Sequence, residues 1–186
     1  MGKFLFPEHA TPLDDVSYLK LPWVHNLKDL NRAEAENISQ AQKKYLQKPV
    51  GDPSKWFHLS YLKKIHLSMF GNVWEWAGKW RISSTKLSYR VMSWSSESSF
   101  LTSIERSARI HHQLVSIHPF ENGNGRFARL VADRYLLAHK KAHPVWPSEI
   151  GKNGSIRREY IEALKDADKG NYQPLIEFIE NFSKEV

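Results

Sequence analysis

Apolar residues recur every three or four positions along several stretches of this chain, as they do on the buried face of an amphipathic helix. Stretches with this spacing cover residues 30–46, about 54–70, 98–117 and 124–139, and flank Gly170 and Pro174. The segments between them are short and rich in proline, glycine and polar residues. The pattern therefore predicts a mainly α fold, a compact helical bundle.

The ends of these helices have local signals. Asp29 or Asn31 is available as the N-cap of the first helix, and Ser54 as that of the second. Residues 48–53 contain two prolines and a glycine, which end the first helix. Because the residue before a proline avoids helical geometry, Pro119 ends the helix that precedes it at His118.

Two segments depart from the helical pattern. Residues 1–28 contain three prolines and are predicted to form an extended N-terminal arm, which leaves residues 29–186 as the folded domain. Residues 71–97 combine glycines and tryptophans with serine, threonine and β-branched residues, which predicts a short β-hairpin flap.

Composition narrows the chemistry. The chain has 186 residues and no cysteine, which excludes disulfides, thiolate metal sites and cysteine nucleophiles. No apolar run approaches the roughly 18 residues of a membrane span, and the first residues do not form a signal peptide. We therefore expect a cytoplasmic protein without membrane segments. The net charge of +7 favours a partner that carries phosphate, either a nucleotide or a nucleic acid.

The stretch His118-Pro119-Phe120-Glu121-Asn122-Gly123-Asn124-Gly125-Arg126-Phe127-Ala128-Arg129 joins two predicted helices. With Asn124 as an N-cap, the first turn of the second helix directs backbone N–H groups and the positive end of its dipole into the loop. Gly123 and Gly125 let an anion approach the backbone, and Arg126 and Arg129 lie on neighbouring faces of that turn. These features suit a polyphosphate.

His118 lies on the opposite side of this loop, at the C-terminal end of the preceding helix. An imidazole beside a polyphosphate can act as a general base for attack on phosphorus. The alternative is an ordinary tight turn, with Arg129 paired to Asp133 on a solvated face.

The same stretch resembles the signature H-x-F-x-[D/E]-G-N-G-R-x-x-R of the Fic/Doc family. The residues that match it are His118, Phe120, Gly123, Asn124, Gly125, Arg126 and Arg129. Residues 69–81 and 160–175 are also similar to the family, and Ala10-Thr11-Pro12-Leu13-Asp14 resembles its mobile mystery protein B subgroup. The resemblance implies the Fic fold over residues 29–186.

The resemblance also implies an activity, transfer of AMP from ATP to a hydroxyl of a target protein. His118 would deprotonate the Ser, Thr or Tyr hydroxyl, and the loop of Gly123, Asn124 and Gly125 would bind phosphates. Arg126 would hold the inner phosphates and Arg129 the γ-phosphate, while the flap around residues 83–92 would hold the target segment.

One position departs from the family pattern. The acidic residue that binds Mg²⁺ in the family is Asn122 here, and Glu121 precedes it. Mg²⁺ normally takes carboxylates together with phosphate oxygens, and an amide oxygen lacks their charge. Weaker metal binding with AMP transfer, transfer of another group such as the γ-phosphoryl, and nucleotide binding without turnover are the three possible outcomes.

An inhibitory segment in cis is a further expectation from the resemblance. Family members carry a helix of pattern [S/T]-x-x-x-E-[G/N], whose glutamate pairs with the second motif arginine. Glu36-Asn37 fits its end, although Arg32 stands at its first position. Glu36 near Arg129 is therefore one hypothesis, and an ordinary charge on a solvated helix face is the other.

The sequence also suggests two other kinds of site, a histidine metal site and a nucleic-acid surface. His111 and His112 suggest a metal, but no acidic partner shows ligand spacing, and His111 lies on the apolar stripe of its helix. Tryptophans 74, 76, 80 and 94 alternate with basic residues, as on some nucleic-acid surfaces, yet they are more often core residues. We therefore expect nucleic acid not to be the partner.

Overall fold

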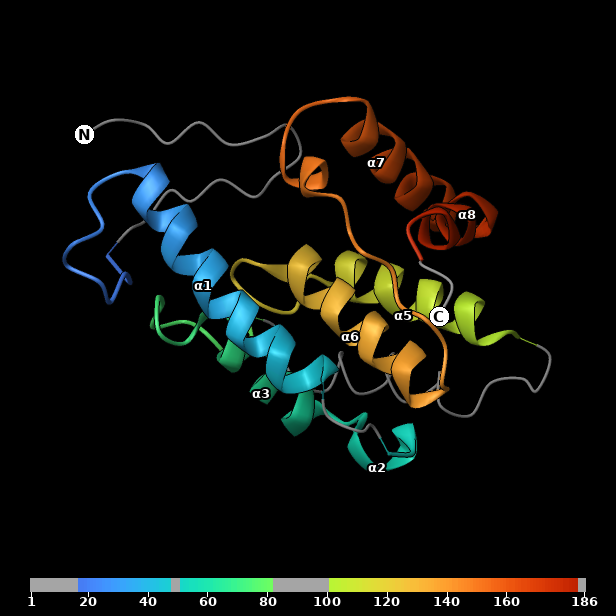
Figure 1. The fold of residues 1–186 in the computed structure, drawn as a ribbon, viewed down its shortest axis with the longest axis horizontal. Helices are drawn as coiled ribbons and strands as arrows, with labels where there is room; N and C mark the ends of the chain where they lie inside the picture. Colours follow the sequence, from blue (N-terminus) through green and yellow to red (C-terminus); the bar gives the residue numbers. More distant parts are fainter. Residues whose placement is uncertain (1–16, 48–50, 82–100, 184–186) are drawn as a thin grey trace.

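Two neighbouring helices, α5 (Ser103–Ile117) and α6 (Asn124–Ala138), form the centre of the computed structural model, which describes residues 17–47, 51–81 and 101–183. On one side pack α1 (Leu27–Leu46) and α3 (Leu59–Phe70), and on the other α7 (Ser155–Asp168) and α8 (Gln173–Asn181) (Figure 1). The short α2 (Pro53–Trp56) and the 3₁₀ helix η1 (Ser148–Gly151) lie in the connections. The predicted mainly α fold is confirmed.

Each half of the molecule has its own apolar core. The larger one joins α1, α3, α5 and α6 and is closed by large side chains that are almost fully buried, among them Leu62, Phe70, Trp74, Phe120 and Phe127. The smaller one joins α5 and the end of α6 to η1, α7 and α8 around Leu136, Leu164 and Phe178. The loop between α5 and α6 lies at the edge of the larger core, because Phe120 is buried there.

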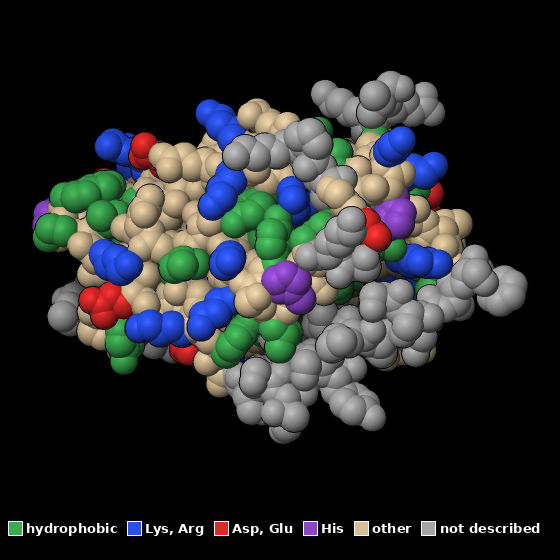
Figure 2. All heavy atoms as spheres, turned by 90° about the horizontal axis from the view of Figure 1, so that it is seen from below, with side chains coloured by type: hydrophobic (Ala, Val, Ile, Leu, Met, Phe, Trp, Pro, Cys, Tyr) green, Lys and Arg blue, Asp and Glu red, His purple; other side chains and the backbone are tan. Residues whose placement is uncertain are grey.

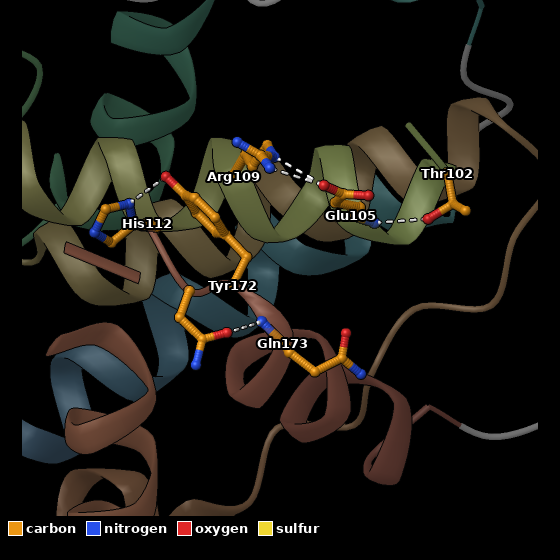
Figure 3. A network of polar contacts seen from close by, with 7 residues as sticks. Thr102, Glu105, Arg109, His112, Tyr172 and Gln173 are labelled. Atoms are coloured by element: carbon orange, nitrogen blue, oxygen red, sulfur yellow. Dashed lines mark hydrogen bonds and ion pairs between the residues drawn. The ribbon is translucent and has the colours of Figure 1, made fainter. Parts of the chain in front are cut away.

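Polar contacts attach α5 to the C-terminal helices (Figure 3). The His112 ring lies 3.1 Å from the Tyr172 hydroxyl, as Figure 3 shows. Its other ring nitrogen lies 2.8 Å from the Asp168 carboxylate. Arg109 lies over the Tyr172 ring and pairs with Glu105 one turn earlier on α5. His111 is fully buried and contacts the Tyr160 hydroxyl at 2.8 Å. Both histidines therefore have structural partners, and the described residues contain no group of acids and histidines that could hold a metal ion.

Helix starts differ from the predictions. The first helix begins at Leu27, because the Asn26 side chain accepts a hydrogen bond from the Asp29 backbone N–H; the predicted caps Asp29 and Asn31 are wrong. The predicted helix over 54–70 is two helices. The backbone is extended at His58, whose ring accepts from the Tyr61 N–H and caps α3. Histidine is not a favoured cap, so this start has a weak sequence signal.

The described part of the N-terminal arm lies against the domain. Leu19 forms an isolated antiparallel bridge with Trp74, supported by a hydrogen bond from the Lys20 N–H to the Val73 carbonyl. The division of the chain at residue 28 stays a prediction, and helix α1 begins one residue before it. The predicted flap around residues 83–92 lies outside the described residues.

The burial of the tryptophans decides between a core role and a nucleic-acid surface. Trp74 and Trp76 are buried, and Trp80 stacks on Phe120, so these rings are core residues and not a nucleic-acid surface; Trp94 lies outside the described residues. Lys and Arg side chains outnumber Asp and Glu on the face shown in Figure 2. No helix among the described residues is long and apolar enough to cross a bilayer.

Candidate active site

The loop between α5 and α6 is shaped by two residues with left-handed backbone. His118 ends α5 with a φ of 51°, and Gly123 precedes α6 with a φ of 77°. A left-handed residue with a side chain costs about 1–2 kcal/mol, so the surrounding contacts must hold His118. Arg81 provides these contacts. Its guanidinium donates to the His118 carbonyl at 3.1 and 3.3 Å, and its backbone N–H donates to the Pro119 carbonyl at 2.8 Å.

The half-buried His118 ring is oriented by its own helix. Its Nδ1 lies 2.8 Å from the Val115 carbonyl oxygen, which can only accept a hydrogen bond. Nδ1 therefore carries the proton, and Nε2 is the basic atom of the neutral ring. This is the tautomer that a general base requires at Nε2.

The start of α6 fits an anion, with one change from the prediction. The N-cap is Gly123, not Asn124, and no side chain caps the helix. Both polar atoms of the Asn124 side chain bond the backbone of Phe120, at 2.9 and 2.8 Å. Asn124 therefore braces the loop with its side chain, and only its backbone N–H belongs to the first turn that would bind a phosphate.

Gly123 and Gly125 have different roles at the start of α6. A Cβ at Gly123 would lie 2.4 Å from Cζ of Phe70, and the positive φ is strained for any other residue. A Cβ at Gly125 would meet nothing closer than Arg129 Nη1, at 3.9 Å. Gly123 is thus required by packing, whereas Gly125 leaves open space beside the backbone.

The two motif arginines lie in different surroundings. Arg126 lies over the Phe70 ring, 4.8 Å from its centroid, and its Nη1 is 2.5 Å from Oε2 of Glu34. Arg129 lies over the rings of Trp146 and Tyr160, at 5.7 and 5.9 Å. Both guanidinium groups come from the first turns of α6, as the spacing predicted.

The alternative reading of the loop, with Arg129 and Asp133 paired on a solvated face, is wrong. Asp133 is 2% exposed, and its carboxyl oxygens accept from the indole N–H of Trp146 at 2.9 and 3.0 Å. Burial raises the pKa of Asp133 well above its usual value, although the Trp146 hydrogen bond and the charge of Arg129 oppose this shift. Asp133 instead fixes the indole over which Arg129 lies.

The acidic residue that pairs with a motif arginine is Glu34, and the arginine is Arg126 rather than Arg129. Glu34 contacts Arg126 and accepts from the Trp74 indole N–H at 2.8 Å. Glu36 is exposed, and within the described part of the chain it makes no ion pair with Arg129. The rotation of α1 explains the difference, because Asn37 is buried and bonds Ser68 and Asn72. Glu34, one turn earlier, therefore faces the site.

Asn122 stands at the expected metal position, and among the described residues its hydrogen bonds are with His66 and Gly123 rather than with a carboxylate. The Oδ1 atom of Asn122 accepts from the N–H of Gly123 at 2.6 Å, and Glu121 is exposed. Mg²⁺ requires several oxygen ligands in near-octahedral geometry, usually including a carboxylate. Asn122 alone, with its oxygen already bonded, does not fit a protein-held Mg²⁺ site.

Two buried histidines predict a pH-dependent stability. Burial lowers the pKa of His66 to about 3, and a hydrogen bond to Asn122 only partly opposes this; burial also lowers the pKa of His111 to about 3. Since unfolding returns each pKa to about 6.5, the unfolded chain binds more protons below that pH. The contribution of each ring to the free energy of unfolding is therefore fully present above pH 6.5. It is lost as the pH falls towards 3, by about 1.4 kcal/mol per pH unit for each ring. Urea unfolding between pH 7.5 and 5 measures this slope.

The matched variants of this experiment are His66→Gln and His111→Gln, each of which should lower the slope between pH 6.5 and 5 by about 1.4 kcal/mol per pH unit. His25→Gln, on the exposed chain before α1, should leave it unchanged. A wild-type stability that is constant over this range would contradict the burial of two neutral rings.

Comparison with known proteins agrees with this geometry. The Fic/DOC family model matches residues 56–136, which contain α3, α5, the loop after α5 and all but the end of α6. The matched stretch is therefore similar to the Fic/DOC family. The resemblance to the mobile mystery protein B subgroup stays a prediction.

Individual relatives share the fold. A solved structure of Fic-1 (residues 134–508) from Caenorhabditis elegans has a TM-score of 0.68 at 22% identity and covers 87% of this chain and 50% of that one. The BepC protein from Bartonella tribocorum, solved with bound AMPPNP, has a TM-score of 0.62 at 21% identity, with 88% and 90% covered. The protein adenylyltransferase fic-1 of C. elegans is 32% identical over 96 residues, 50% of this chain but only 18% of that protein. The chain thus matches less than a fifth of the length of this curated relative.

Three residues of the site have no local signature in the sequence. Arg81, His66 and Glu34 contact the motif from segments that lie 37, 56 and 92 residues away. Their only sequence signals are a charged or titratable side chain next to an apolar stripe, which many unrelated positions share. Only the tertiary structure shows that they meet at one loop.

Proposed function

We propose that this chain transfers AMP from ATP to a Ser, Thr or Tyr hydroxyl of a target protein. The observation that carries the proposal is the meeting, across one short loop, of the His118 ring, whose basic atom is Nε2, with the Gly123-capped start of α6 and its two arginines. The names of the curated relatives favour the same reaction.

In the proposed reaction, Nε2 of His118 takes the proton of the target hydroxyl while its oxygen attacks the α-phosphorus of ATP. A new P–O bond forms, the bond to the β-phosphate oxygen breaks, and pyrophosphate leaves. The N–H groups at the start of α6 and the guanidinium groups of Arg126 and Arg129 stabilise the charge on the phosphates. His118 then returns its proton to solvent.

The test of this proposal uses ATP labelled at the α- or the γ-phosphate, incubated with the chain and with lysate proteins. Label from α-labelled ATP alone, on the chain or on a lysate protein, supports AMP transfer. Label from γ-labelled ATP alone indicates phosphoryl transfer instead. No label from either nucleotide contradicts both transferase proposals.

Mg²⁺ is proposed only as a companion of ATP, held by the phosphate oxygens, since Asn122 offers an amide oxygen that already accepts from the Gly123 N–H. It would lower the charge of the triphosphate. A cytoplasmic location likewise stays a prediction.

The substitution at Asn122 favours a second candidate, a nucleotide-binding regulator without turnover. Asn122→Asp adds a carboxylate where the family has one, so the AMP transfer rate should rise and become more dependent on Mg²⁺, by about 10-fold for one charged ligand contact of about 1.4 kcal/mol. The measurement is the transfer rate against Mg²⁺ concentration for both proteins. ATP binding with no transfer in either protein would support the regulator and contradict the transferase.

We also propose that α1 inhibits the site in cis through Glu34. Its carboxylate holds the guanidinium of Arg126, with exposed side-chain fractions of 12% and 34%, so phosphates and Glu34 compete for one cation. Glu34→Gln keeps an oxygen for the Trp74 indole but removes the charge. ATP should therefore bind about 10-fold more tightly, as expected for loss of about 1.4 kcal/mol of competition.

The matched control is Glu36→Gln, which removes the same charge from the same helix at an exposed position. Calorimetry should find its ATP affinity equal to that of the wild type. Equal affinities for Glu34→Gln and the wild type would remove the inhibitory role of α1 and leave the nucleotide site itself intact.

A further inference from the structure

His66 connects three separate parts of the domain. It belongs to α3 and is fully buried, with its ring stacked on Phe120 at a centroid distance of 3.6 Å and an interplanar angle of 10°. Its Nδ1 lies 3.0 Å from the backbone nitrogen of Gly78, and its Nε2 lies 3.0 Å from the carbonyl oxygen of Asn122. One ring therefore bonds the segment after α3 and the loop before α6.

These two contacts fix the tautomer. The Gly78 backbone N–H can only donate, so Nδ1 of His66 accepts, and Nε2 carries the ring proton that it donates to Asn122. Burial keeps the ring neutral, because it lowers the pKa of His66 to about 3, and the nearby charge of Arg126 acts in the same direction. The ring thus presents one donor and one acceptor at any pH near neutrality.

The contact with Asn122 sets the direction of a peptide group. In a trans peptide the C=O and the following N–H point in opposite directions. Because the Asn122 carbonyl points at His66 on α3, the N–H of Gly123 points away from α3, where it now meets Oδ1 of Asn122. Gly123 has no Cβ, which leaves a rotation of this peptide otherwise easy.

We propose that His66 is a positioning residue that holds the Asn122–Gly123 peptide with its N–H directed into the phosphate-binding loop. Asn122 Oδ1 marks the place of an anionic oxygen, and a nucleotide phosphate takes over this hydrogen bond when it binds. The inference rests on the proposed nucleotide site and adds a residue to it that makes no contact with the ligand.

Three variants separate the contacts of the ring. His66→Gln keeps a donor for the Asn122 carbonyl, His66→Asn keeps an acceptor near the position of Nδ1, and His66→Phe keeps the ring on Phe120 but loses both polar contacts. Calorimetry gives their ATP affinity, initial rates give kcat and KM for transfer, and thermal unfolding reports their fold.

A misplaced group at such a site costs about 100-fold in rate. We expect His66→Asn and His66→Phe to lose about that factor in kcat/KM, together with ATP affinity, while His66→Gln restores most of both. If His66→Phe matches the wild type in affinity and rate, or if His66→Gln is as impaired as an equally stable His66→Phe, the positioning role is wrong.

A readout without activity protects the test against poorly folded variants. In the wild type, ¹⁵N spectra of the histidine rings should show His66 with its proton on Nε2, unchanged from pH 7.5 to 5.5. A proton on Nδ1 would overturn the proposal. If the wild type binds no ATP while the Nε2 proton is observed, the proposed nucleotide function fails and the His66 contact stands as a structural one.

Discussion

Replacement of His118 with alanine should lower the rate of AMP transfer by a factor of about 10² to 10⁴, the usual contribution of a positioned general base. The imidazole has its Nδ1 proton fixed on the Val115 carbonyl, so Nε2 is the atom that accepts the proton of the target hydroxyl. ATP affinity should change little, because the proposed phosphate site consists of the start of α6 and its arginines and does not include the His118 ring. Transfer from α-labelled ATP and calorimetry measure the two quantities separately.

The control for this variant is His25→Ala, which removes an exposed histidine ahead of α1 and should leave transfer unchanged. His118→Ala also leaves the Arg81 contacts with the backbone in place, since they use the carbonyls of His118 and Pro119. A His118→Ala protein that transfers AMP at the wild-type rate would remove His118 from the mechanism.

Gly123→Ala should destabilise the domain and abolish ATP binding. The new Cβ would lie 2.4 Å from the Phe70 ring, which packs against the Arg126 guanidinium, and alanine at a φ of 77° is strained. The strain costs about 1–2 kcal/mol, and overpacking a full core adds about 1–3 kcal/mol. Urea unfolding should therefore show a loss of about 2–5 kcal/mol.

Two other glycines separate these contributions. Gly170 has a φ of 90° and open space around it, so Gly170→Ala should cost only the backbone strain. Gly125 is in the first turn of α6 without a close neighbour, and Gly125→Ala should keep or slightly raise stability. Equal losses for Gly123→Ala and Gly170→Ala would show that the contact with Phe70 contributes nothing.

Local patterns predicted much of this domain. The apolar spacing of α1, α5 and α6 matches their buried faces, and the motif between His118 and Arg129 placed His118 and the start of α6 at the two ends of one loop. Such features depend on neighbours within a few residues, which a sequence displays directly. Helix starts were less predictable, because Asn26 caps α1 from within the predicted arm, and His58 caps α3 although histidine is not a favoured N-cap.

The contact between Glu34 and Arg126 shows where local reasoning fails. Glu34 and Glu36 are two residues apart on one helix and have the same chemistry, so only the rotation of α1 decides which one reaches the site. The buried hydrogen bonds of Asn37 with Ser68 and Asn72 set that rotation, and they cross from α1 to α3 and the turn after it. His66 and Arg81 depend on tertiary contacts in the same way.

The proposed function depends on binding of a triphosphate at the bend between α5 and α6, and calorimetry with ATP measures this binding most directly. Glu34→Gln is the best protein for the titration, because Arg126 is then released from its carboxylate partner. We predict measurable heat with ATP, and its loss when Arg126→Ala is combined with Glu34→Gln. Absence of heat in Glu34→Gln, or equal ATP affinity with and without the Arg126 guanidinium, would contradict the central claim.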